Sequence, residues 1–309
     1  MLKDREASSL QEAAVHDGPK MTTIATETER KLASAVERMP AFPKSVQRIL
    51  ELTRDINCAP KELVSVIEKD PVMTVKILQV INSAYYNMPS RIHSVGQSVV
   101  YLGLNTVKNL ALTFAAVGML PRFSSDGFDM QEYLLHSLTT AGIARQFVAA
   151  YAKGEVDPGD CYIAGLLHDF GKAVFAQFMP EEFSRALHES SQNGTPLHIA
   201  ETEILGADHA FVGGLLVAKL KFPDPMVECI RNHHSPDFPP NAMMDCVRVA
   251  NQVSRKLGLG KSGSRWTDTE PVAAPGRFGE SFDVIIENLG DIDKIVADAQ
   301  TFAQLGAAG

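Results

Sequence analysis

Prolines stand at the starts of short apolar helices in the first third of this chain. Pro43, Pro60 and Pro71 lie just inside or just before segments whose apolar residues recur three and four positions apart. Proline suits the first helical turn because the backbone N–H that it lacks has no partner there. Short helices are therefore predicted at 30–39, 45–54, 61–69 and 72–84. They should form a compact bundle rather than a solenoid, since no fixed period recurs.

The same helical spacing continues along the rest of the chain. Further helices are expected at 97–102, 106–119, 130–151, 160–178, 181–192, 196–205, 208–221, 225–233, 243–257, 282–288 and 291–302. No stretch alternates apolar and polar residues for long enough to demand a strand, and β-branched residues dominate nowhere. The sequence therefore predicts an all-α protein.

Composition divides the chain into five expected parts. Residues 1–28 are polar and irregular, which is typical of a flexible tail. Two helical bundles are expected, an N-terminal one over 29–121 and a second one over 130–258. The Gly-, Pro- and Ser-rich stretch 259–281 is predicted to be a surface loop, and C-terminal helices occupy 282–309. The amphipathic end IVADAQTFAQL is expected to dock on the bundle, with homodimerisation as the alternative.

Charge and segment hydropathy exclude several classes of protein. With 29 basic and 37 acidic residues the formal net charge is −8, which argues against a nucleic-acid partner. Apolar windows fall far short of the ~20 residues that cross a bilayer, and MLKDREASSLQEAAVHDGPK has no apolar core of a secretory signal. A cytoplasmic protein without membrane contact is expected. The four cysteines form no CxxC pair, so a zinc ribbon and a disulfide framework are not expected.

One apolar segment carries an adjacent histidine and aspartate. His168 and Asp169 stand in AGLLHDFGK at 164–172. Burying both is costly unless they pair or bind a cation. Adjacent helical residues point about 100° apart, so both can reach one ion placed over that edge. Gly171 is expected to loosen the backbone before Lys172. The alternative is a hydrogen-bonded histidine beside a surface aspartate.

Short motifs around this segment occur in the order of a known family. They are MPAFPKSVQRILELTRD at 39–55, Asp70-Pro71, Asn82-Ser83-Ala84 and Gln97 to Gly103 within 67–112, LHSLTTAGIA from 135, LLHDFGK, ILGADHAFVGGLLVAKLKFP, the pair His233-His234 and VRVANQVSRKLG. LLHDFGK resembles the signature of the HD superfamily of metal-dependent phosphohydrolases, and the whole series resembles the HDOD subfamily. The resemblance covers roughly 37–258. It implies an N-terminal helical bundle packed on an HD-like helical bundle.

The resemblance also implies a set of metal ligands. Its members are His136, His168, Asp169, His209, His233, His234 and Asn251, the last standing where catalytic relatives carry an aspartate. An amide carbonyl can ligate a hard cation but supplies no charge, and Asp245 is a substitute candidate. Asp208, beside His209, is either a helix cap or a partner that fixes the tautomer of a ligand ring.

Imidazoles with one carboxylate suit iron, zinc, nickel or manganese rather than magnesium or calcium. Two such ions could activate a water molecule and hold a phosphoryl oxygen. Asp169 and Lys172 are then the candidate catalytic residues, with Lys172 holding a phosphate as a point charge.

Two functions are compatible with these residues. The first is a bacterial regulatory module for signal transduction, which contacts signalling proteins and retains a metal site. The alternative is a metal-dependent phosphohydrolase acting on a nucleotide or cyclic nucleotide, so whether the chain is an enzyme stays open. HHSPDFPPNAMMD lacks the Gly-Tyr-Pro element that follows the paired histidines in the branch that cleaves cyclic dinucleotides. That absence argues against this particular substrate.

Overall fold

Helices form every regular element of the described chain. The computed structural model describes residues 26–52, 59–83, 86, 88–121, 123–235, 238–239, 241–264 and 276–307. In these residues the extended pairing is limited to one isolated bridge, Ser125 with Phe128. The predicted all-α class is therefore confirmed. Most of the predicted tail, and 265–275 of the predicted loop, lie outside the described residues.

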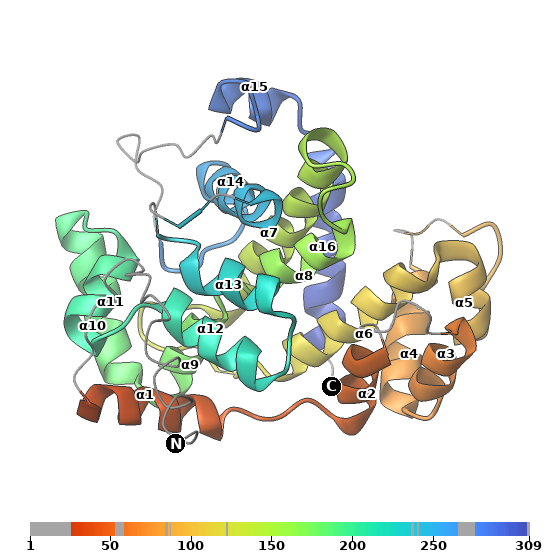
Figure 1. Cartoon of the computed structure of the whole chain (residues 1–309), viewed down its shortest axis with the longest axis horizontal. Helices are drawn as coiled ribbons and strands as arrows, with labels where there is room; N and C mark the ends of the chain where they lie inside the picture. The colour runs from red at the N-terminus through yellow and green to blue at the C-terminus, as the bar shows by residue number, and fades with distance from the viewer. Residues whose placement is uncertain are drawn as a thin grey trace, which may run out of the picture.

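The helices follow one another with short connections. They are α1 (Thr26–Arg38), α2 (Lys44–Leu52), α3 (Pro60–Glu68), α4 (Pro71–Ile81), α5 (Val95–Leu102), α6 (Leu104–Gly118), α7 (Met130–Tyr151), α8 (Pro158–Leu167), α9 (Phe170–Phe178), α10 (Pro180–Asn193), α11 (Leu197–Leu205), α12 (His209–Lys219), α13 (Asp224–Asn232), α14 (Ala242–Lys256), α15 (Phe282–Glu287) and α16 (Ile292–Ala307). Figure 1 shows α2–α5, here called the N-terminal bundle, on one side and α7–α14, here called the C-terminal bundle, on the other.

Local capping explains where the helices of the N-terminal bundle begin. Pro60 and Pro71 occupy the first turns of α3 and α4, as the sequence predicts. Asp70 caps α4 by accepting a hydrogen bond from the Met73 backbone N–H, and Ser94 caps α5 in the same way. Gly103, with φ of +82°, makes the turn from α5 into α6. Buried aliphatic side chains then fill the space between these helices.

Helix α1, which the predicted range 29–121 places with the N-terminal bundle, packs on the C-terminal bundle. It contacts α9 and α12 of the C-terminal bundle, and Figure 1 shows it running beneath that bundle. Its buried face consists of Leu32, Ala35 and Val36. Lys219 at the end of α12 donates hydrogen bonds to the carbonyls of Val36, Glu37 and Met39, which satisfies the C-terminal end of α1.

The C-terminal helix α16 docks on the molecule. It packs on α7 and also contacts α4 and α6. The rings of Phe302 and Phe114 lie 5.8 Å apart across the contact with α6. One helix thereby touches both bundles.

The predicted single helix at 160–178 is two helices. Helix α8 ends at Leu167 and α9 begins at Phe170, so His168 and Asp169 lie at the break. Gly171 does not loosen the backbone: it belongs to α9, and a side chain there would approach the His209 carbonyl oxygen to 2.0 Å. Glycine is therefore needed for the close approach of α9 to α12.

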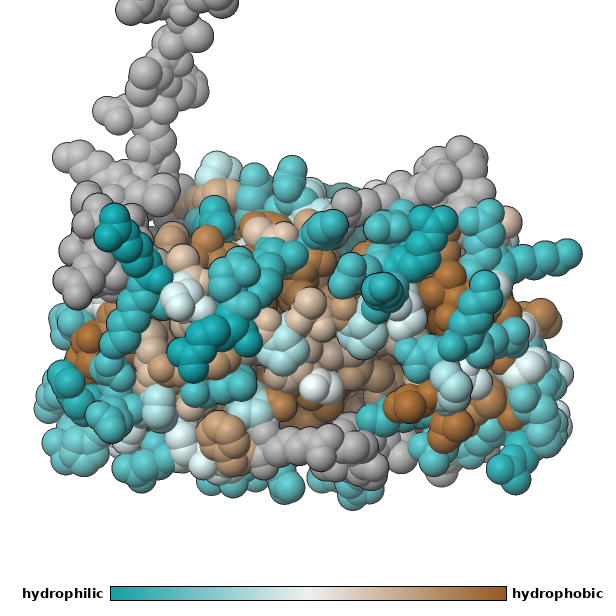
Figure 2. Space-filling view, turned by 90° about the horizontal axis from the view of Figure 1, so that it is seen from below, coloured by the Kyte–Doolittle hydropathy of each residue, from teal (hydrophilic) through white to brown (hydrophobic). Residues whose placement is uncertain are grey.

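Polar side chains cover much of the face seen in Figure 2, and apolar ones gather over the N-terminal bundle at its right. Large exposed apolar residues include Val72 and Val75 on α4 and Val100 and Tyr101 on α5. Among the described helices, none combines the length and apolar character needed to cross a membrane.

Candidate metal centre

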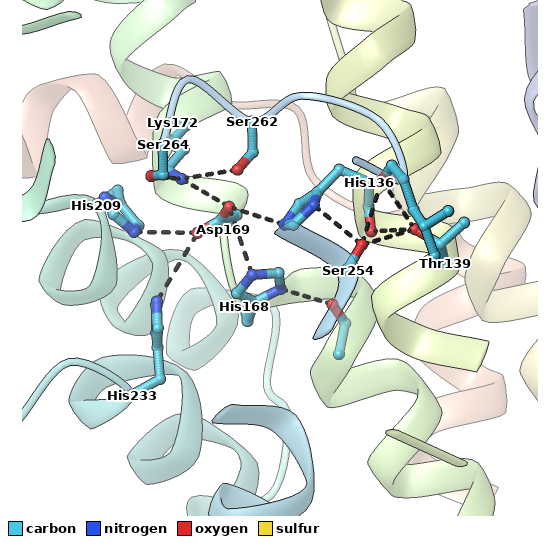
Figure 3. Close-up of polar contacts among 12 residues, drawn as sticks. His136, Thr139, His168, Asp169, Lys172, His209, His233, Ser254, Ser262 and Ser264 are labelled. Atoms are coloured by element: carbon cyan, nitrogen blue, oxygen red, sulfur yellow. Dashed lines mark hydrogen bonds and ion pairs between the residues drawn. The ribbon is translucent and has the colours of Figure 1, made fainter. Parts of the chain in front are cut away.

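Five helices of the C-terminal bundle (α7, α8, α9, α12 and α13) bring polar side chains to one buried point. His136 comes from the middle of α7, and His168 and Asp169 come from the break between α8 and α9. His209 is the first residue of α12, and His233 and His234 directly follow α13. Figure 3 shows most of these side chains turned toward Asp169. The structure thus gathers every predicted histidine ligand around the predicted aspartate.

Asp169 lies at the middle and offers one oxygen to each side. Its Oδ2 is 3.4 Å from His168 Nε2 and 3.7 Å from His136 Nε2. Its Oδ1 is 3.0 Å from His209 Nε2 and 3.8 Å from His233 Nε2. Two groups of ligand atoms that could hold a metal ion, each gathered within 4.8 Å, therefore share Asp169. The groups are His136, His168 and Asp169 on one side and Asp169, His209, His233 and His234 on the other.

The ring nitrogens show that these residues suit a metal ion. The Nδ1 atoms of His168 and His233 lie 2.7 and 2.8 Å from the carbonyls of Gly165 and Ile230. A carbonyl oxygen can only accept a hydrogen bond, so each Nδ1 carries the proton and each Nε2 presents its lone pair. The Nε2 atoms of His136, His168 and His233 are buried and have no hydrogen-bond partner among the described residues. Buried nitrogens that all face one carboxylate are what a transition-metal site requires.

The protonation states also suit a metal ion. Burial lowers the pKa of His136 to about 3, and it lowers the pKa of His168, His233 and His234 as well. Burial acts to raise the pKa of Asp169, but His168 and Lys172 outweigh it and hold that pKa well below its usual value. These four histidines are thus neutral and Asp169 is ionised, the forms in which such side chains bind metals.

Lys172 bonds inside the site. Its Nζ donates to Asp169 Oδ2 at 2.7 Å, to Ser262 Oγ at 3.3 Å and to Ser264 Oγ at 3.1 Å. These three contacts use the three donors of the ammonium group. The predicted phosphate-binding role therefore requires Lys172 to give up at least one of them. Ser262 and Ser264 belong to the predicted surface loop, whose segment 259–264 lies over the ligands (Figure 3).

Three other predicted residues occupy different surroundings. Asn251 is buried on α14, and its Oδ1 has no hydrogen-bond partner in the part of the chain that the structure describes. It lies one turn before Ser254, whose hydroxyl is 3.3 Å from His136 Nδ1. Asp245, the substitute candidate for a ligand, forms an ion pair with Arg277 Nε at 3.1 Å. Asp208 caps α12 by accepting from the Phe211 N–H, which agrees with the helix-cap alternative.

Two residues of this centre were missed from the sequence. Glu201 on α11 is buried, and its Oε2 accepts a short hydrogen bond from His209 Nδ1 and another from the His209 backbone N–H at 2.9 Å. His198, one turn earlier, stacks on His234 with ring centroids 4.3 Å apart. Burial acts to lower the pKa of His209, but Glu201 and Asp169 outweigh it and raise the pKa to about 9. The available signal was an acidic residue on the apolar face of the helix at 196–205.

Comparison with known proteins agrees with this architecture. The family model of the HDOD domain matches residues 39–236. An uncharacterised protein of Treponema pallidum (strain Nichols) is 27% identical over 248 residues, which are 77% of this chain and 47% of the relative. The chain thus spans about half the length of that curated relative. The family match covers more than half of the chain, so this protein belongs to the HDOD family.

Solved structures share the fold. An HDOD domain protein of unknown function from Geobacter sulfurreducens superposes with a TM-score of 0.70 at 23% identity, over 91% of this chain and 96% of that one. A candidate signal transduction protein from Marinobacter aquaeolei VT8 superposes with a TM-score of 0.72 at 23% identity, over 93% of this chain and 67% of that one. At these identities the likeness shows the fold alone.

Proposed function

We propose that this protein is a regulatory HDOD module that acts through protein–protein contacts and holds a divalent transition metal in the described centre. The burial of the ligands is the observation that carries the proposal. His136, His168 and His209 are 0% exposed and Asp169 is 1% exposed. Segment 259–264, bonded to Lys172, lies over them. An ion so enclosed stabilises the fold and its conformation rather than meeting a substrate.

The ligand chemistry selects the class of ion. The ligands are imidazole nitrogens and a carboxylate, and iron, zinc, manganese and nickel bind such mixtures. The two groups that share Asp169 provide for one ion or two. A bound ion would supply a fixed positive charge that satisfies the buried Nε2 atoms. Lys172 would meanwhile hold Asp169 in place through its Oδ2.

The N-terminal bundle offers the surface for a partner protein. Val72 is 66% exposed and Val75 is 53% exposed on α4, and Val100 is 82% exposed on the adjoining α5. Exposed apolar side chains gathered on one part of a surface are typical of protein contact sites. The Marinobacter aquaeolei protein is described as a candidate for signal transduction, which is consistent with such a role.

Elemental analysis is the test of the metal centre. We expect protein purified without added metal or chelator to contain close to one or two equivalents of a transition metal. Asp169→Ala should contain none. Removing the ion with a chelator should lower the melting temperature. A wild-type protein without any metal would contradict the proposed centre.

Partner binding is tested separately from metal binding. We expect the wild-type chain, fixed on a resin, to retain a signalling protein that Val72→Asp/Val100→Asp loses. Ile199→Asp changes an exposed apolar residue of α11 and serves as the control. Equal retention by both variants would argue against the α4–α5 surface.

One observation favours the alternative of a metal-dependent phosphohydrolase. Asp169 belongs to both ligand groups, and paired ions that share a carboxylate provide the charge needed to hold a phosphoryl oxygen. In that case segment 259–264 must move and free Lys172 from Ser262 and Ser264. Turnover of a nucleotide panel by Mn²⁺- or Fe²⁺-loaded protein, abolished in Asp169→Ala, would support the enzyme. No turnover across the panel would exclude it.

A further inference from the structure

The two ligand groups of the metal centre differ in the partners of their histidine Nδ1 atoms. His168 has a backbone carbonyl behind Nδ1, and the nearest partner of His136 Nδ1 is a hydroxyl. On the other side, His233 likewise has a carbonyl, whereas His209 has the carboxylate of Glu201. Of these four histidines, His209 is the one with an anionic partner at Nδ1, and it belongs to the four-residue group.

The chain builds this contact from two helices that meet at a tight turn. Helix α11 ends at Leu205, and Gly206 follows it with a φ of +81°, in the left-handed region. The chain then turns back within three residues to begin α12 at His209. Glu201 thereby faces the first turn of α12. Its Oε2 accepts from both the backbone N–H and the Nδ1–H of His209. A carboxylate in this position also interacts favourably with the positive end of the helix dipole.

Holding Nδ1 in this way fixes the opposite edge of the ring. With its proton on Nδ1, His209 presents a lone pair on Nε2. The Nε2 atom lies 3.0 Å from Asp169 Oδ1 and 2.9 Å from His234 Nε2. Figure 3 shows this edge directed at Asp169. An imidazole whose Nδ1–H bonds a carboxylate is also a stronger electron donor to a metal than one whose Nδ1–H bonds a carbonyl.

The charge balance of the site also favours a cation on the His209 side. Asp169 already bonds the ammonium group of Lys172 at 2.7 Å, which offsets its charge. Glu201 is completely buried, and its ion-pair partner is His209. When His209 is a neutral ligand, the charge of Glu201 remains to attract a cation bound to that ring.

We infer that Glu201 is a positioning residue that makes the His209 side the stronger of two metal positions, so that it fills first. This inference rests on the proposed metal centre. It assigns the Asp169, His209, His233 and His234 group to the tightly held ion. The His136, His168 and Asp169 group would take a second ion at higher concentration.

A cobalt titration tests the inference on the full-length, metal-free protein. Co²⁺ is added in the presence of a competing chromophoric chelator, and its visible absorption reports the ligands of each ion. We expect wild-type protein to take up two ions of different affinity. Glu201→Gln should lower the affinity for the more tightly bound ion by 10- to 100-fold, the range typical of residues that hydrogen-bond a metal ligand. The affinity for the second ion should not change.

Matched variants separate positioning from folding. Glu203→Gln makes the same chemical change at an exposed position of the same helix, and both affinities should match those of the wild type. His136→Ala should abolish only the weaker ion. If Glu201→Gln does not fold, Glu201→Asp keeps the charge but shortens its reach, and we expect a weaker first ion there too.

Three results would overturn the inference, each in a recognisable way. Wild type without bound cobalt would defeat the proposed metal centre together with the role of Glu201. If Glu201→Gln binds two ions with unchanged affinities, the proposed role of Glu201 is wrong but the metal centre stands. Equal weakening of both ions, with a lower melting temperature of the metal-free protein, would show a merely structural role.

Discussion

The two bundles use their motif residues in opposite ways. In the N-terminal bundle, the Asn82 amide donates to the carbonyls of Leu78 and Ile92 and accepts from the Ile92 N–H at 2.7 Å. Gln97 accepts from the His93 N–H. In the C-terminal bundle, the buried Nε2 atoms of His136, His168 and His233 have no hydrogen-bond partner among the described residues. Motif residues of the first kind hold the backbone, whereas the buried Nε2 atoms of the second kind are placed where they could bind a ligand.

The difference teaches how to separate structural from functional motifs. A motif side chain that makes all its hydrogen bonds to nearby backbone has a structural role, which accounts for its presence. A buried polar side chain whose bonding is incomplete requires a further partner. The comparison also predicts that substitutions in the two bundles will affect different measured quantities.

The largest effect is expected at Asp169. Replacing it with alanine removes the carboxylate shared by both ligand groups and leaves the buried Lys172 charge without its counterion. We expect the metal content to fall to zero and the free energy of unfolding to drop by about 3–5 kcal/mol. Elemental analysis and urea unfolding measure the two quantities. Asp169→Ala/Lys172→Met should regain stability without regaining metal, and metal retained in either variant would contradict the assigned centre.

A pH dependence follows from His209 in the metal-free protein. Its pKa is raised to about 9 in the folded state, against 6.5 for an ordinary histidine. The folded state therefore holds this proton more tightly, so its contribution is complete below pH 6.5 and is lost as the pH rises to 9. The loss is on the order of 3 kcal/mol, at about 1.4 kcal/mol per pKa unit.

Urea unfolding of chelator-treated protein at several values between pH 6 and 9.5 measures this loss. Glu201→Gln should flatten the profile, because Glu201 is the main group that raises this pKa. An equally steep fall in the variant would show that other groups cause it.

Much of this architecture was predictable from the sequence, because periodicity and proline placement are local signals. The family motifs then pointed to the histidines and Asp169 as candidate ligands, and the structure brings these residues together. Glu201 was not predictable in the same way, because its partner His209 lies beyond a turn and on another helix. The contacts of α1 with α9 and α12 were likewise not predictable, since its apolar face of Leu32 and Val36 fits either bundle. Contacts between helices distant in sequence decide such features, and periodicity does not report them.

A smaller effect is expected at Asn82. Alanine there would remove three hydrogen bonds and leave the backbone N–H and C=O of the buried Ile92 without this partner. We expect the free energy of unfolding to fall by about 2 kcal/mol. The metal content should remain that of the wild type. Loss of metal in this variant would show that the two bundles are not separable as described.

The smallest effect is expected at Asp70, which ties α2 to the start of α4. Its Oδ1 accepts from the Met73 N–H at 3.1 Å, and its Oδ2 accepts from Ser45 Oγ at 2.8 Å. Asp70→Ala removes the cap and should cost about 1 kcal/mol in urea unfolding. Asp70→Asn should change stability by only a few tenths of a kcal/mol, because asparagine caps helices equally well.

Partner binding decides between the two possible roles of Asp70. If the residue acts only through the backbone, Asp70→Asn binds the partner as the wild type does, and Asp70→Ala does so at temperatures where it is folded. A loss of partner binding in Asp70→Asn without a loss of stability would require the carboxylate charge itself to contact the partner. The N-terminal motif would then be functional as well, and the contrast between the bundles would concern only what each one binds.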